Sequence, residues 1–143
     1  MNPEGRFQAL TSLIPELEAT NDYGDWVFSK DEQNSSCVTN CAPYFRYTDL
    51  MNRIYYKTKH VIDSLPNGAQ LGIAEVYLRR AGIDYRHIED INISELDEYC
   101  ILALLRHIYA FERFGEGYVQ HFFHRGYVLK WIKRLQEIDD ESL

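Results

Sequence analysis

The sequence predicts a mainly α-helical (α+β) single domain spanning residues 1–143, a bundle of about five or six helices around a buried central helix, with one small β-hairpin. Apolar residues recur at the three- and four-residue spacing of amphipathic helices along most of the chain. The segment from Tyr99 to Phe114 is apolar around most of its circumference, which is typical of a helix at the centre of a bundle. The chain is also long enough for one core, and no internal repeat or linker divides it.

The N-terminal part combines a short helix with the hairpin. Asn2 can cap a helix that has Pro3 in its first turn, and Pro15 interrupts that helix. Two aromatic and β-branched stretches, 25–29 and 43–47, predict the two strands. Because an isolated hairpin is marginal in water, we expect its aromatic side chains to dock on the helices, namely Trp26, Phe28, and Phe45 or Tyr44.

Helices make up the rest of the predicted fold. Thr48 can cap a helix that stops at Pro66, and the next helix ends at Gly82. The segment 94–97, Ser-Glu-Leu-Asp, matches an N-terminal capping pattern and predicts the start of the central helix. A short aromatic helix and a last helix follow, and Gly126 separates them. The last helix has an apolar face and a polar face, with Val128, Trp131, Ile132, Leu135 and Ile138 on the first and Lys130, Lys133, Arg134 and Glu137 on the second.

Composition points to a soluble cytoplasmic protein. The cysteines are odd in number, Cys37, Cys41 and Cys100, and no signal-like pattern precedes them. No apolar run is long enough to cross a bilayer. Cys37 and Cys41 lie in the loop 31–41 and are separated by three residues, a wider spacing than in a zinc knuckle, so we predict no metal and no other cofactor there.

Charge and tyrosine content favour a protein partner. The net charge of -7 disfavours nucleic-acid binding through the field of the whole protein. The charge is uneven, because six acids face only Arg86 between positions 84 and 98, whereas 117–136 contains four basic residues and no acid. The chain also has 11 tyrosines, a residue type that is enriched at interfaces. We therefore expect an acidic, tyrosine-rich surface that binds another protein.

The C-terminal third resembles a known family. Residues 110–117 read AFERFGEG, Phe122-Phe123 and Gly126 follow, and residues 129–139 read LKWIKRLQEID. These motifs, with looser agreement at 25–27, 43–44 and 94–97, resemble a family of small bacterial proteins of unknown function. Gly115 stands where that family has a cysteine. The resemblance implies an origin in Firmicutes and their mobile elements, and hence an accessory role, but no reaction.

The alternative function is a small enzyme or ligand-binding protein. Glu112, Arg113 and Glu116 follow each other at the end of the central helix, where two carboxylates beside a guanidinium can bind a polar ligand or form structural pairs. Such a pocket would also collect one or more of His107, His121 and Tyr109. No common catalytic motif occurs in the chain, which favours a binding module over an enzyme.

Two further candidates carry alternative chemistries. His121 and His124 have a spacing that can present two imidazoles to a metal, but no third ligand is identifiable, so we predict packed or exposed histidines. We expect Cys100 to be a buried thiol and His107 a core histidine with a hydrogen-bond partner. A third reading, direct DNA binding, would need four basic side chains on one exposed face, namely Arg125, Lys130, Lys133 and Arg134.

Overall fold

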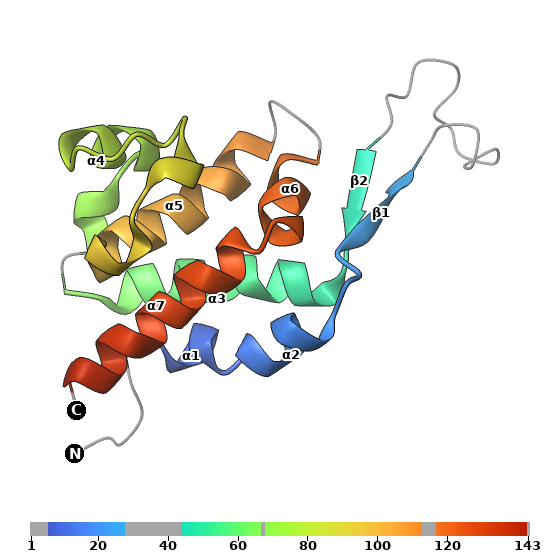
Figure 1. Ribbon diagram of the computed structural model, residues 1–143, viewed down its shortest axis with the longest axis horizontal. Helices are drawn as coiled ribbons and strands as arrows, with labels where there is room; N and C mark the ends of the chain where they lie inside the picture. The colour runs from blue at the N-terminus through green and yellow to red at the C-terminus, as the bar shows by residue number, and fades with distance from the viewer. Residues whose placement is uncertain (1–5, 28–43, 67, 113–116, 143) are drawn as a thin grey trace.

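The computed structural model describes residues 6–27, 44–66, 68–112 and 117–142. The helices are α1 (Gln8–Thr11), α2 (Ile14–Ala19), α3 (Asp49–Ser64), α4 (Ala74–Arg80), α5 (Glu98–Phe111), α6 (Tyr118–His124) and α7 (Tyr127–Ser142), with 3-10 turns η2 (Gly68–Leu71), η3 (Ile88–Asp90) and η4 (Ile93–Glu95). Two strands, β1 (Gly24–Val27) and β2 (Tyr44–Tyr47), form one antiparallel hairpin. The predicted mainly α class with one small hairpin is thus confirmed (Figure 1).

Helix α5 is the centre of the fold. Its residues from Cys100 to Leu105, together with His107 and Ile108, are buried, so the helix is covered on nearly every side. It packs against α3, α4, α6 and α7, which surround it in Figure 1. The predicted apolar face of α7 is also buried, from Val128 to Ile138. No helix within the described ranges is both long enough and apolar enough to cross a membrane.

The hairpin projects from one side of the bundle (Figure 1). Trp26 lies opposite Phe45 in the register, and their rings meet edge to face. Phe45 is buried as predicted, whereas Trp26 remains 41% exposed, so its docking is only partial. The Trp26 ring lies against Gly117 at the start of α6, where a Cβ would come within 2.9 Å of it. Phe28 and the side chain of Tyr44 lie outside the described residues.

The N-terminal helix is interrupted as predicted, Thr48 takes the predicted N-cap position of α3, and the predicted cap at Ser94 is wrong. Pro15 lies in the first turn of α2, and the chain breaks between α1 and α2 just before it. Thr48 precedes α3, but its hydroxyl makes no cap hydrogen bond.

The central helix starts after Asp97, whose carboxylate accepts from Cys100 N at 2.8 Å, and not at Ser94. Ser94 lies inside η4 instead, because Leu96 is extended and buried and so separates the two turns. The predicted cap at Asn2 and Pro3 lies outside the described residues.

Candidate functional site

Glu112 holds α6 in place. It is the residue directly after α5, and its carboxylate accepts hydrogen bonds from Gly117 N at 2.8 Å and Val119 N at 2.9 Å. The first N–H groups of a helix have no partner within the helix, so this carboxylate satisfies two of them and also meets the positive end of the helix dipole. Glu112 therefore fastens α6 to α5. Arg113 and Glu116, the other two members of this predicted ligand site, lie outside the described residues.

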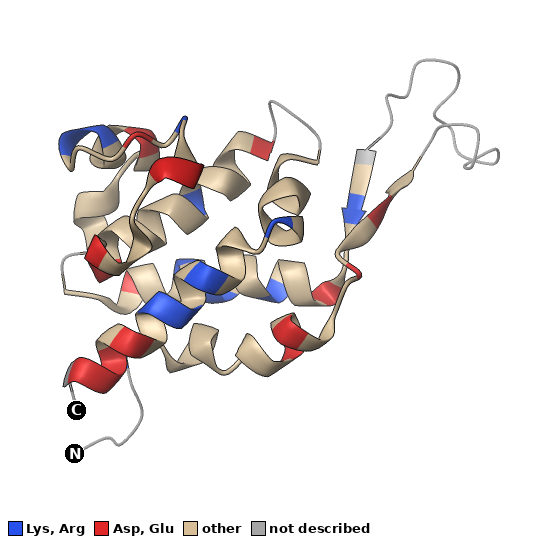
Figure 2. Ribbon diagram, in the orientation of Figure 1, with Lys and Arg blue, Asp and Glu red and all other residues tan. Residues whose placement is uncertain are grey.

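The basic residues predicted for nucleic acid are dispersed over different environments. Lys133 pairs with Glu18 of α2 at 2.9 Å. Arg134, expected in solvent, is only 16% exposed at its side chain, because it donates to Leu96 O and pairs with Glu137. Lys130 lies over the Tyr127 ring, and Arg125 lines a separate cleft. Figure 2 shows basic residues in the middle of α7 and acidic residues at its C-terminal end. Such a surface, with two of its four cations paired to carboxylates, disfavours binding of a phosphate backbone.

The histidine and cysteine candidates have different environments. Within the described ranges, no three His, Cys, Asp or Glu side chains gather as a metal site. Cys100 is buried, and burial together with the nearby Asp97 raises its thiol pKa to about 12, so the nucleophilic thiolate is disfavoured. His107 is 2% exposed, and its Nε2 lies 3.3 Å from the Tyr118 hydroxyl. This agrees with the prediction of a core histidine that has a partner.

Half of the acidic residues in the segment 84–98 hold the fold together. Asp84 accepts from Arg86 N at 3.1 Å and contacts His87 Nδ1 at 2.7 Å, so the pKa of Asp84 is lowered, chiefly by the His87 contact and then by the Arg86 amide. Asp97 caps α5, and Glu98 pairs with Arg6 at 3.1 Å. The other three, Glu89, Asp90 and Glu95, are exposed and make no ion pair with any other described residue.

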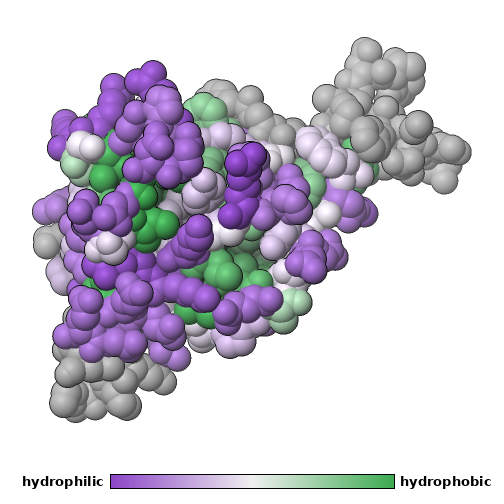
Figure 3. All heavy atoms as spheres, viewed as in Figure 1, coloured by the Kyte–Doolittle hydropathy of each residue, from purple (hydrophilic) through white to green (hydrophobic). Residues whose placement is uncertain are grey.

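Two of these three acids line a groove of about 520 Å³ between the end of α4 and the start of α5. Ile83 and Ile91 line the groove and are partly buried against the core, and Leu96 is 4% exposed. Asp84, Asp90 and Glu95 also line it, together with His87 and Asn92. Figure 3 shows an apolar patch framed by hydrophilic side chains over this connection between α4 and α5. We call this feature, with its isoleucines and its carboxylates, the acidic groove.

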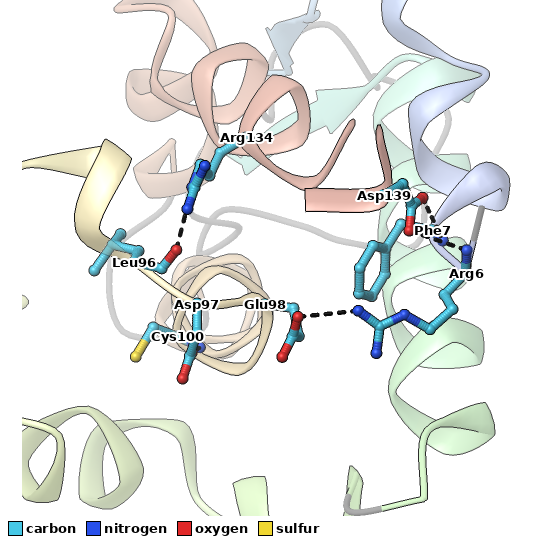
Figure 4. A network of polar contacts seen from close by, with 8 residues as sticks. All are labelled: Arg6, Phe7, Leu96, Asp97, Glu98, Cys100, Arg134 and Asp139. Carbon is cyan, nitrogen blue, oxygen red and sulfur yellow. Dashed lines mark hydrogen bonds and ion pairs between the residues drawn. The ribbon is translucent and has the colours of Figure 1, made fainter. Parts of the chain in front are cut away.

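Hydrogen bonds fix the backbone of the acidic groove. Gly82 ends α4 in the left-handed conformation, at φ +78°, and Ile83 N donates back to Leu78 O at 2.9 Å. Asn92 accepts from Ser94 N and from Ser94 Oγ. Figure 4 shows Arg134 of α7 reaching the carbonyl of Leu96, beside the cap of α5 at Asp97. The groove is therefore a preformed surface, although it contains no regular helix.

A second hollow, of about 380 Å³, lies on the other side of the same segment. We call it the aromatic cleft, because Tyr85, Phe111, Tyr118, Phe122 and Tyr127 line it. His107 lies among these rings, and Arg86, Glu89, His121 and Arg125 also line the cleft. The histidines of the predicted alternative site thus meet here. Glu112 does not line this cleft, and Tyr109 lines a different pocket beside α3.

Most tyrosines are not on the acidic surface. Eight of the 11 are partly buried against the core, namely Tyr23, Tyr47, Tyr77, Tyr85, Tyr99, Tyr109, Tyr118 and Tyr127. Tyr55 and Tyr56, with exposures of 40% and 66%, are on α3 and do not line the acidic groove. The tyrosine excess therefore reflects packing at the edge of the core more than one tyrosine-rich patch.

Comparison of the chain with protein-family models, with curated proteins and with solved structures gives no match. The family resemblance of the sequence stays a prediction.

The sequence reasoning missed both hollows for different reasons. It identified the acids of the groove but not its apolar floor, because Ile83 and Ile91 lie outside any regular helix and so outside any periodic pattern. The spacing of the two isoleucines around an acidic stretch is the signal that could have found it. The aromatic cleft collects side chains from α5, α6, α7 and the 85–89 segment, and no local pattern joins residues that are so far apart in sequence.

Proposed function

We propose that the protein is a noncovalent binding module whose acidic groove holds a basic segment of a partner protein. The observation that carries the proposal is the combination of an apolar floor with two carboxylates, those of Asp90 and Glu95, that form no ion pair with any described residue. Asp90 and Glu95 supply charge, and Ile83 and Ile91 supply apolar surface beside them. A lysine- or arginine-containing segment with an apolar side chain complements both.

The two parts of the groove would act at different steps of binding. The net charge of -7 attracts a basic partner over several ångströms and raises the association rate, an effect that salt screens. The apolar floor contributes only after contact, when the partner's side chain leaves water, and this contribution is insensitive to moderate salt. The fixed backbone of the groove lowers the entropy that is lost on binding.

The family resemblance adds a biological context to this proposal. A protein of this kind in the bacterial cytoplasm would act as an accessory or inhibitor of a mobile element, by occupying a basic surface of a host protein. The groove defines the chemistry of the partner segment, and affinity purification identifies the partner itself.

The test is a comparison of two charge-matched variants in affinity purification. The variant Asp90→Asn/Glu95→Gln removes two carboxylates from the groove, and the control Asp63→Asn/Asp140→Asn removes two exposed carboxylates elsewhere. Tagged wild-type protein and both variants are incubated with nuclease-treated bacterial lysate, and the bound proteins are quantified by mass spectrometry.

We expect a stoichiometric partner that wild-type and control protein retain and the groove variant loses. Binding measured on the purified partner should weaken at least about tenfold in the groove variant, because two charged contacts are lost. It should also weaken with salt much more for the wild type than for the groove variant. A partner that binds both variants equally, or that disappears with nuclease treatment, would refute the proposal.

A further inference from the structure

The wall of the aromatic cleft is a series of rings, each of which packs against the next. The ring centroids of Tyr85 and His107 are 4.8 Å apart, and those of His107 and Phe111 are 5.4 Å apart. Tyr118 continues the wall, with its centroid 4.9 Å from Phe111 and 5.0 Å from Phe122. Tyr85, Phe111 and Tyr118 are partly exposed and line the hollow, whereas His107 and Phe122 are buried. A planar ligand could therefore stack on the rings of this wall.

Polar groups occur both in the wall and at its edge. The imidazole of His107 and the hydroxyl of Tyr118 form one hydrogen-bonded pair within the wall. Arg86, Arg125 and Glu89 line the cleft and are exposed. Neither Arg125 nor Arg86 makes an ion pair with any other residue in the described ranges, and Arg86 has Asp84 as an electrostatic neighbour. The cleft thus adds guanidinium groups to an aromatic wall.

We propose that the aromatic cleft binds a planar heteroaromatic anion, whose ring stacks within the wall and whose phosphate or carboxylate binds Arg125 and Arg86. The hollow of about 380 Å³ lies within the usual range for a small-molecule site. Guanidinium groups bind phosphate and carboxylate in a bidentate geometry, which fixes the orientation of the ligand. This site does not depend on the acidic groove, and either proposal can fail alone.

Charge separates this ligand class from the main alternative. Aromatic walls also bind organic cations through the faces of their rings, and Glu89 could assist such a ligand. Among the residues that line the cleft, two guanidinium groups stand beside one carboxylate, and this balance favours an anion over a cation. The carboxylate of Glu75, which does not line the cleft, acts on His107 and Tyr118. His107 does not add a positive charge at neutral pH, because its burial lowers its pKa below 6.5. The Tyr118 hydroxyl, which is bonded to His107 Nε2, can make one further hydrogen bond, which suits a heteroaromatic ring more than a plain hydrocarbon ring.

Binding is tested by two-dimensional NMR titration of the isotope-labelled protein with small probes. Adenosine monophosphate and nicotinate carry the two kinds of anion, and adenosine and nicotinamide are their uncharged counterparts. Nicotinamide methylated at its ring nitrogen, a pyridinium ion, represents the cation. The variants are Arg125→Gln, which removes one guanidinium from the cleft, and Lys57→Gln, which removes an exposed charge from α3 as a matched control. Circular dichroism of each variant checks that it is folded.

We expect at least one anion to saturate the cleft, with the largest chemical-shift changes at residues 85–89 and 118–125. Its neutral counterpart should bind at least about tenfold more weakly. Comparison of the two anions tells whether the site takes phosphate or carboxylate. The substitution Arg125→Gln should weaken binding of the anion by a similar factor, and Lys57→Gln should leave it unchanged. Tighter binding of the cation, equal binding of anion and neutral probe, shifts confined to other regions, or no saturation by either anion at about 10 mM would each overturn the proposal.

Discussion

Replacing Asp139 with alanine tests how the N-terminal segment is held to the rest of the fold. Asp139 of α7 is 6% exposed, and its carboxylate accepts from Arg6 N at 3.1 Å and from Phe7 N at 3.0 Å. Figure 4 shows both bonds, with Arg6 also reaching Glu98 at the start of α5. Phe7 and Leu10 are both fully buried. One carboxylate therefore positions the residues that anchor α1 in the core.

The size of the effect follows from what the alanine leaves behind. A hydrogen bond to a charged group contributes about 1.5–3 kcal/mol, and a buried donor without a partner costs about 1–3 kcal/mol. The Phe7 amide is buried and the Arg6 amide is only partly so, hence the second bond counts for less. We expect Asp139→Ala to lower the free energy of unfolding by roughly 3–4 kcal/mol, out of the about 5–15 kcal/mol that is typical of a domain. Asp139→Asn keeps one acceptor oxygen and should lose about half as much.

The assay is urea unfolding followed by circular dichroism, with Asp140→Ala as the matched control. Asp140 is the next residue along α7, is exposed and has no partner among the described residues, so its loss should change stability by less than about 0.5 kcal/mol. Hydrogen exchange gives a second measure, because the amides of Arg6 and Phe7 should lose protection in Asp139→Ala. A loss of stability below about 1 kcal/mol with unchanged protection of these amides would show that the carboxylate does not hold this segment.

Three more predictions follow from single contacts. Glu112→Ala should lower the free energy of unfolding by about 2–3 kcal/mol, since two N–H groups of α6 lose their acceptor; a urea titration that matches wild type would contradict the capping role. Burial keeps His107 neutral in the fold, so its pKa by NMR should lie below 6.5 and its contribution to stability should be lost as pH falls below 6.5, whereas His87, beside Asp84, should titrate above 6.5. Gly117→Ala should destabilise more than Gly82→Ala, because both glycines have positive φ but only Gly117 has a ring within 3 Å of the added methyl group; equal melting temperatures would exclude this contact.

The sequence predicted the helical part of the fold well, because burial there follows a regular period. The sequence predicts the apolar face of α7 residue by residue, and α5 is buried on nearly all sides as its composition indicates. The prediction is weaker where two nearby residues fit the same structural role. Ser94 and Asp97 both fit a helix cap, and the buried Leu96 between them decides that Asp97 is the cap of α5.

The candidate site was less predictable, because the same residue types serve structure and binding. Glu112 and Arg134 carry charge in the sequence, yet one caps α6 and the other donates to the Leu96 carbonyl. Sequence spacing cannot distinguish these roles, since each depends on a backbone group that is distant in the chain or reached across a turn. The acids of the groove were found from charge alone, while the positions of Ile83 and Ile91 required the tertiary structure.

One segment of the chain lines two hollows with opposite character. Around η3, Arg86 and Glu89 line the aromatic cleft, whereas Asp84, Asp90 and Ile91 line the acidic groove. The short 3-10 turn places successive side chains on different sides, so neighbours in sequence belong to different surfaces. Substitutions can therefore be assigned to one hollow or the other, and Asp90→Asn/Glu95→Gln should leave probe binding in the cleft unchanged. If it abolished that binding while the protein stayed folded, the two hollows would have to be treated as one site.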